Sequence, residues 1–298
     1  MKKGSTTSRF GTSSRISHDA SAFYNSRLYS EILESEDIHP ISDNPFPVML
    51  ENKIIQSNSE NMKEIPDNSL HLMVTSPPYN VTKEYDENLS LQEYLQLLEH
   101  VFSETFRVLT HGGRACVNVA NLGRRPYIPL SDFISHIMLN IGFKMRGEII
   151  WHKGAGAGIS MAWGSWQSAS NPVLRDTHEY ILIFSKGSFG RKKENGKENT
   201  ITREQFMEWT KSVWNINPES AKKIGHPAPF PVELPYRLIQ LYTYKEEIIL
   251  DPFMGSGSTA IAALKSERRY VGYEIDTEYI KLAEERIKQN NALLAPNS

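Results

Sequence analysis

The chain has 298 residues, of which 39% are apolar, and a formal net charge of −2. This composition is ordinary for a globular protein, and the nearly neutral charge is not typical of nucleic-acid-binding domains, most of which are basic. No apolar run approaches the roughly 20 residues of a membrane helix. Cys116 is the only cysteine, which rules out an intramolecular disulfide framework. We therefore expect a cytoplasmic protein with no membrane segment and no metal site.

The chain is predicted to begin with an extended, Ser- and Arg-rich arm and an irregular connection, which together span residues 1–48. From Lys53 onward, apolar stretches with strand and helix periodicity alternate, which predicts an α/β fold with a mainly parallel sheet and helices on both faces. Residues 111–113, which contain two glycines, are expected to end the first helix. The expected elements are strand 70–75, helix 91–109, strand 115–119, helix 131–141, strands 145–151 and 180–184, helix 231–243, strand 247–250, helix 258–265, strand 270–273 and helix 277–289.

Residues 185–224 interrupt this alternation. Between residues 186 and 223 there are nine Lys or Arg against five Glu, a balance of +4, together with four aromatic residues. Such a local excess of positive charge can neutralise phosphates on an otherwise nearly neutral protein. The segment is therefore predicted to be a recognition element inserted into the α/β body. A solvated, charged loop is the alternative.

The segment Asp251–Thr259 joins a predicted strand to a predicted helix and contains the pattern Gly255-x-Gly257. Glycines at this place let a ligand approach the backbone amides at the helix N-terminus. Glu274 ends the next strand, where a carboxylate is well placed to accept hydrogen bonds from ribose hydroxyls. Ala260 follows where a dinucleotide-binding loop has its third glycine, and no phosphate-binding lysine is present. The pattern thus favours a cofactor without pyrophosphate over NAD(P) or ATP, with a simple tight turn as the alternative.

A second loop, Thr75–Asn80, also follows an apolar strand and reads Thr-Ser-Pro-Pro-Tyr-Asn. An exocyclic amine on an aromatic ring is planar and weakly nucleophilic, because its lone pair is delocalised. The hydroxyl of Ser76 and the carbonyl of Pro77, which Pro78 holds rigid, can accept hydrogen bonds from the amine. These hydrogen bonds favour a tetrahedral nitrogen. Tyr79 offers a flat face for stacking a base. A polyproline-like surface turn is the alternative.

Together the two loops resemble the catalytic and S-adenosylmethionine (AdoMet) loops of the DNA amino-methyltransferases, and their order is that of the β class. The resemblance implies a Rossmann-like AdoMet-dependent methyltransferase fold, with a catalytic half at 49–184, a DNA-recognition insertion at 185–224 and an AdoMet-binding half at 225–298. A Pro-rich loop that starts at His226 is similar to the family element that closes over the methionine end of AdoMet. The implied catalytic residues are Ser76, Pro77, Pro78 and Tyr79, and the implied AdoMet-binding residues are Asp251, Phe253, Gly255, Ser256, Gly257, Thr259, Glu274, His226 and Pro227.

In this family, Ser at the first position of the catalytic loop is commoner among cytosine-N4 enzymes, so Ser76 favours N4 of a cytosine flipped out of duplex DNA. The same fold acting on adenine N6 is the nearest alternative, followed by an RNA or protein methyltransferase and by a non-catalytic DNA-binding protein. Cytosine-C5 methylation needs a thiolate, and Cys116 lies in an apolar strand where a thiol is inert. The resemblance implies a bacterial or archaeal modification enzyme, with a cognate endonuclease as a possible separate partner and either a monomer or a homodimer. The candidate DNA contacts are Lys153, Trp166, Arg175, Arg191 and Lys192.

Overall fold

The computed structural model describes residues 24–29, 42–78, 89–154, 163–191, 196–219, 224 and 230–294. The chain separates into two compact units, Met1–Pro40 and Ile41–Ser298. In the first unit, the rings of Tyr24 and Tyr29 pack edge to face with their centroids 5.3 Å apart. The elements named below belong to the second unit.

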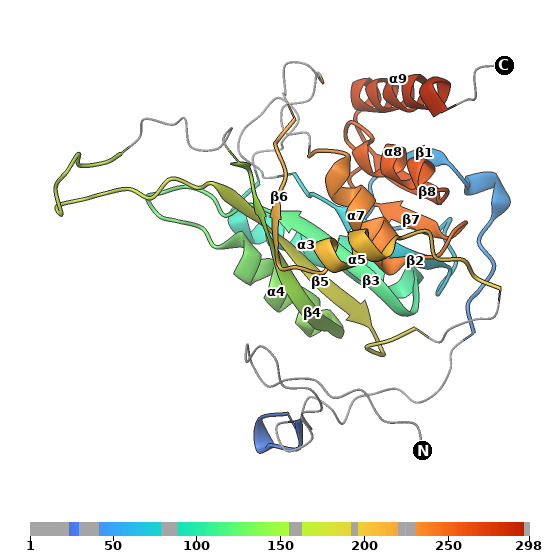
Figure 1. Ribbon diagram of the computed structural model, residues 1–298, viewed down its shortest axis with the longest axis horizontal. Helices are drawn as coiled ribbons and strands as arrows, with labels where there is room; N and C mark the ends of the chain where they lie inside the picture. Colours follow the sequence, from blue (N-terminus) through green and yellow to red (C-terminus); the bar gives the residue numbers. More distant parts are fainter. Residues whose placement is uncertain are drawn as a thin grey trace. The chain divides into compact units, whose positions relative to one another are not determined.

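A single eight-stranded sheet runs through the second unit in the order β1-β8-β7-β2-β3-β5-β4-β6 (Figure 1). Neighbouring strands are parallel except at β5, which is antiparallel to both β3 and β4. The strands are β1 (Lys53–Gln56), β2 (Leu70–Thr75), β3 (Leu109–Val119), β4 (Phe143–His152), β5 (His178–Lys186), β6 (Val213–Asn215), β7 (Ile248–Asp251) and β8 (Arg269–Glu274). The carboxyl ends of β2 and β7 therefore meet at one edge of the sheet.

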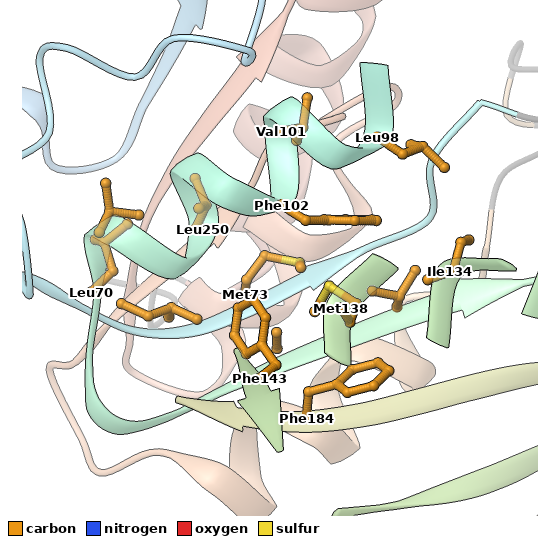
Figure 2. Packing of buried hydrophobic residues seen from close by; sticks show 14 of the residues in the cluster. Leu70, Met73, Leu98, Val101, Phe102, Ile134, Met138, Phe143, Phe184 and Leu250 are labelled. Atoms are coloured by element: carbon orange, nitrogen blue, oxygen red, sulfur yellow. The ribbon is translucent and has the colours of Figure 1, made fainter. Parts of the chain in front are cut away.

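Helices cover both faces of this sheet. One face packs against α3 (Leu91–Val108) and α4 (Leu130–Ile141), and Figure 2 shows Phe102 of α3 and Met138 of α4 pointing toward Met73 and Phe184 of the sheet. The other face packs against α5 (Arg203–Trp209), α7 (Glu233–Tyr242), α8 (Ser258–Lys265) and α9 (Thr277–Leu294). A short 3-10 turn, η1 (Val48–Leu50), precedes β1. Within the described residues, no helix has the length and apolar character needed to cross a bilayer.

The central strand β2 shows why the sheet needs cover on both sides. Leu70 and Met73 belong to the core beneath α3 and α4, whereas Leu72 and Val74 belong to the opposite core. A strand that is buried on both faces has a nearly continuous apolar sequence, as expected inside a parallel sheet. The predicted α/β fold, with a mainly parallel sheet between two layers of helices, is confirmed.

Most predicted elements occur within a few residues of their expected bounds, and strand 70–75 and helix 258–265 match fully. The expected ending of the first helix at residues 111–113 is wrong. Helix α3 ends at Val108, and β3 begins at once with Leu109, whose backbone is extended. The two glycines lie inside β3, where the register against β2 shifts between Leu70 and Leu72. A glycine there fits because Gly112 has a φ of +76°.

The segment 185–224 is not wholly separate from the sheet. Its short strand β6 pairs in parallel with β4, so that Trp214 lies opposite Trp151. Trp214 is 1% exposed, and its indole nitrogen donates to the backbone oxygen of Trp209, 3.1 Å away. Two of the four aromatic residues of the segment, Trp209 and Trp214, therefore belong to the core beside α7. The division of the chain into four parts stays a prediction.

Trp214→Ala should lower the free energy of unfolding by about 3–5 kcal/mol, because it leaves a large cavity between β6 and α7. Phe206→Ala is the matched control from the same segment, since Phe206 is half exposed, and it should change stability by no more than about 0.5 kcal/mol. Chemical denaturation of both variants provides the measurement. Equal losses for the two variants would show that β6 is not part of the core.

Candidate active site

Two loops leave the sheet side by side at its carboxyl edge. The strands β2 and β7 are parallel neighbours, with Met73 opposite Leu250, so Ser76 follows one strand end and Pro252 the other. The hydroxyl of Thr75 donates to Oδ1 of Asp251 over 2.7 Å, in a fully buried hydrogen bond. In open α/β sheets, ligands bind in the crevice outside such strand ends. The fold therefore places the two loops singled out by sequence against one crevice.

Asp251 is a buried carboxylate with one unused acceptor. Burial raises the pKa of Asp251 to about 7, although hydrogen bonds from Thr259, Thr75 and the backbone amide of Phe253 act in the opposite direction. The Phe253 amide lies 3.1 Å from Oδ1. No described group hydrogen-bonds to Oδ2. A buried carboxylate oxygen without a donor is unfavourable, which favours the protonated carboxyl group and agrees with the raised pKa.

The glycine loop after β7 is fixed by its neighbours. Gly257 caps α8 with a φ of +79°, and a Cβ at this position would lie 3.0 Å from the Cβ of Ala283 in α9. The carboxylate of Glu274 accepts from the backbone amide of Gly255 at 2.8 Å, and its other oxygen accepts from the amides of Ile275 and Asp276. Glu274 thus joins the loop to the end of β8. Its place at the strand tip is the one expected from sequence.

Two neighbours of this loop were missed by sequence reasoning. The guanidinium of Arg286, in α9, donates to the backbone oxygen of Ser256 and lies 3.8 Å from a carboxylate oxygen of Glu219. Ile275 follows Glu274 directly and is 62% exposed. The contact of Arg286 with the loop has no signal in the sequence, because it depends on how α9 lies against the loop.

A polar network lies beneath Ser76. The amide nitrogen of Asn118, in β3, donates to the Ser76 hydroxyl oxygen at 3.4 Å and to Oε2 of Glu179, in β5, at 2.6 Å. The ammonium of Lys153, just after β4, is 2.5 Å from Oε1 of Glu179 and stacks over the ring of Trp151. Asn118 and Glu179 are 2% and 7% exposed. The ends of four adjacent strands thus contribute to one site around Ser76.

This network gives Lys153 a different partner from the expected DNA phosphate or base. Asn118 and Glu179 were not predicted as site residues. The available signal was a polar residue within or next to an apolar run, Asn118 in 115–119 and Glu179 just before 180–184. Burying such a residue costs free energy unless it is hydrogen-bonded. Pro77 is buried and Pro78 partly buried at the start of the loop. Tyr79 lies outside the described residues.

Arg191 also differs from its expected role. Its guanidinium donates to both carboxylate oxygens of Glu247, at 2.5 and 2.6 Å, and its side chain is only 13% exposed. Burial alone would raise the pKa of Glu247, but Arg191, His71 and Lys197 lower it to about 2. Arg191 therefore anchors its segment to the body of the protein and does not contribute to a DNA surface.

The remaining candidates fall in two groups. Trp166 and Arg175 lie in the connection between β4 and β5. Lys192, His226 and Pro227 lie outside the described residues, so their assignments stay predictions. Cys116, set aside as a nucleophile, is fully buried, and burial raises its pKa to about 12.

Comparison with known proteins identifies the class that this fold and site define. A family model described as DNA methylase matches residues 70–285, so the chain belongs to that family. Among curated relatives, the type II methyltransferase M.MjaI of Methanocaldococcus jannaschii is 31% identical over 278 residues, covering 79% of this chain and 90% of that protein. The type II methyltransferase M.MthZI of Methanothermobacter thermautotrophicus is 30% identical over 272 residues, covering 80% and 76%.

Solved structures agree with this membership. TTHA0409 of Thermus thermophilus, determined in complex with S-adenosyl-L-methionine, is 30% identical, with a TM-score of 0.65, and the match covers 78% of this chain and 91% of that one. PvuII DNA methyltransferase, which is cytosine-N4-specific, is 19% identical, with a TM-score of 0.64 and coverage of 82% and 93%. At that identity the second likeness shows the shared fold alone.

Asp251→Asn tests the buried carboxylate through pH. The pKa of Asp251 is raised from 3.8 to about 7, so its contribution to stability is full below pH 4 and is lost as the pH rises to about 7. The asparagine variant lacks this titration. The stability of the wild type relative to the variant should therefore fall between pH 4 and 8 in denaturant unfolding at a series of pH values. A difference that stays constant, or that grows with pH, would contradict the raised pKa.

Proposed function

We propose that this protein is a β-class, site-specific DNA methyltransferase that transfers the methyl group of AdoMet to the exocyclic N4 of a cytosine flipped out of duplex DNA. The observation that carries this proposal is the buried hydrogen bond between Thr75 and Asp251. It holds the loop suited to an aromatic amine directly beside the loop suited to the cofactor. A methyl transfer in a single step needs its donor and acceptor in such immediate proximity.

The cofactor loop fits AdoMet in its chemistry. AdoMet supplies a methyl group made electrophilic by a sulfonium, and it carries no phosphate, in keeping with a loop that lacks a dinucleotide or P-loop fingerprint. We assign ribose binding to Glu274, and we place Asp251 in the cofactor site as the buried residue that holds the loop through Thr75 and the Phe253 amide. The AdoMet complex of TTHA0409 supports this choice of cofactor. Further contacts are proposed from Phe253, Gly255, Ser256, Gly257, Thr259, His226 and Pro227.

In the proposed reaction, the oxygens of Ser76 and Pro77 accept hydrogen bonds from the two N–H groups of the target amine, and Tyr79 stacks on the base. The donated hydrogen bond from Asn118 occupies one lone pair of the Ser76 hydroxyl and so directs the other toward the amine. The nitrogen lone pair forms the new bond to the methyl carbon, while the carbon–sulfur bond electrons stay with sulfur. The methylated nitrogen then loses a proton, which needs no strong base because that nitrogen has become acidic.

The choice of cytosine N4 rests on Ser76 and the family tendency described above. Adenine N6 in the same fold is the second candidate. An RNA or protein substrate is less favoured because the AdoMet loop lies C-terminal to the chemistry loop, and a non-catalytic DNA-binding role is less favoured because both loops are intact. The relatives M.MjaI and M.MthZI are type II methyltransferases, which supports a role in protecting DNA against a separate cognate endonuclease in a bacterial or archaeal cytoplasm.

The decisive experiment is incubation of the purified protein with labelled AdoMet and unmethylated genomic DNA, followed by nucleoside mass spectrometry. We expect labelled N4-methylcytosine, and sequencing of the product DNA then gives the recognition site. N6-methyladenine would keep the reaction type and overturn the assignment of the base. AdoMet binding without any labelled nucleoside would refute DNA as the substrate.

Mutations in the two loops should affect different steps, turnover in one case and AdoMet binding in the other. Tyr79→Ala removes a base-stacking face, worth about 1–3 kcal/mol, and should lower turnover by roughly 10- to 100-fold with AdoMet affinity nearly unchanged. Glu274→Ala should weaken AdoMet binding by a similar factor, because hydrogen bonds to a charged group contribute about 1.5–3 kcal/mol. Calorimetric titration with AdoMet, together with methylation kinetics at saturating AdoMet, measures both effects. Loss of AdoMet affinity in Tyr79→Ala, or its retention in Glu274→Ala, contradicts the division of roles.

A further inference from the structure

The connection between β4 and β5 carries a distinct hairpin, residues 163–177, which we call the finger. Because β4 runs parallel to β6 and in the same direction as β3, its end at His152 lies at the sheet edge from which Ser76 also leaves. Figure 1 shows the yellow-green connection projecting well beyond the ends of the strands. The finger is therefore placed on the side of the molecule where a substrate must approach.

The finger is held in one conformation by its own hydrogen bonds. Gly164 and Pro172 form an antiparallel bridge. The amide of Val173 donates to the oxygen of Trp163 at 3.0 Å, and the amide of Ser165 donates to the oxygen of Asn171 at 2.8 Å. These bonds close the turn at its tip. A tip ordered before binding loses little entropy when it meets a partner.

The base of the finger is tied to the neighbouring loop after β3. The guanidinium of Arg124 pairs with Asp176 at 2.6 Å and donates to the backbone oxygen of Leu174 at 3.1 Å. It also lies over the ring of Tyr127, with 5.9 Å to the centroid. The loop and the finger thus form one surface.

This surface exposes tryptophan side chains, which the rest of the protein buries. Trp151, Trp209 and Trp214 are at most 8% exposed, whereas Trp163 and Trp166, both in the finger, are 37% and 64% exposed. The two indole rings of the finger pack edge to face at 5.2 Å. Large exposed aromatic residues grouped in one place mark an interaction site.

Cations accompany these aromatic residues. The Arg175 guanidinium stacks on Trp163 at 3.9 Å from the ring centroid, which supports the indole from one side. Arg124 and Arg125 lie in the adjoining loop. Aromatic faces interleaved with arginines are suited to bases and phosphates together. An apolar protein partner would not explain the arginines. The chemistry of this surface therefore favours nucleic acid as the partner.

We infer that the finger is the duplex-DNA contact of this enzyme and that Trp166 is the wedge that enters the base stack when the target base is flipped out. The inference rests on the proposed function, because methylation of an exocyclic amine inside a duplex requires an extruded base and leaves a gap. Apolar wedges that fill or open such a gap are known for proteins that distort DNA. Trp166 is the most exposed tryptophan of the described chain, and it belongs to an ordered finger that projects from the sheet edge at which Ser76 lies.

The test compares the methylation kinetics of two duplexes that share the recognition site. In one, the target base is paired; in the other, it faces an abasic site, so that no pairing opposes flipping. Trp166→Ala should lower kcat/KM on the paired duplex by about tenfold or more, since it loses the stacking that offsets extrusion. On the abasic duplex the loss should shrink to about twofold or less. AdoMet affinity should not change.

Leu139→Ala is the control, because Leu139 is a half-exposed apolar residue of α4, outside the finger, the segment 185–224 and both candidate loops. It should leave kcat/KM unchanged on both duplexes. An equal loss on both duplexes for Trp166→Ala would reduce the finger to a docking contact and overturn the wedge role. No loss on either duplex would refute the finger as the DNA contact.

The wedge and the proposed function fail in distinguishable ways. An active wild type with an unaffected Trp166→Ala variant refutes the wedge alone. A wild type that binds AdoMet and methylates no DNA refutes the proposed function and the wedge with it. If the methylated base is adenine, the same pair of duplexes is made with adenine as the target, and the wedge is judged by the same ratio of rates.

Discussion

The hydrogen bond between Thr75 and Asp251 joins residues 176 positions apart in the chain and fixes the ends of two neighbouring parallel strands. Everything at the candidate site depends on this junction. It sets the Ser-Pro-Pro loop after β2 beside the glycine loop after β7. Both loops are short, so the sheet determines their relative position. Because the junction lies in the interior, water does not compete with it.

Around this junction, the protein keeps polar groups where an apolar core would be more stable. Oδ2 of Asp251 and Oδ1 of Asn118 are both buried, and no described group hydrogen-bonds to either atom. Each such acceptor lowers stability, and each lies next to one of the two loops of the candidate site. Strained or unsatisfied groups of this kind gather at functional sites. The apolar layers under α3 and α7 supply the stability that offsets them.

The sequence predicted those parts of the fold that local patterns determine. Strand 70–75 and helix 258–265 were found in full, because their apolar residues follow strand and helix periodicity. The roles of Arg191, Trp214 and Asn118 could not be read in this way, since each depends on a partner brought close only by the sheet. Arg191 looked like a phosphate contact because its neighbours are basic, but its partner Glu247 is 56 residues away. Strand β6 was missed because three residues carry too little periodicity.

A structure of the protein bound to duplex DNA and S-adenosylhomocysteine, the demethylated cofactor, tests the central claim most directly. We predict that the sulfur lies between the two loops, that the ribose hydroxyls contact Glu274, and that the N4 of a flipped-out cytosine lies within hydrogen-bonding distance of Ser76. A cofactor bound away from Asp251–Thr259, or a target amino group remote from Ser76, would contradict it.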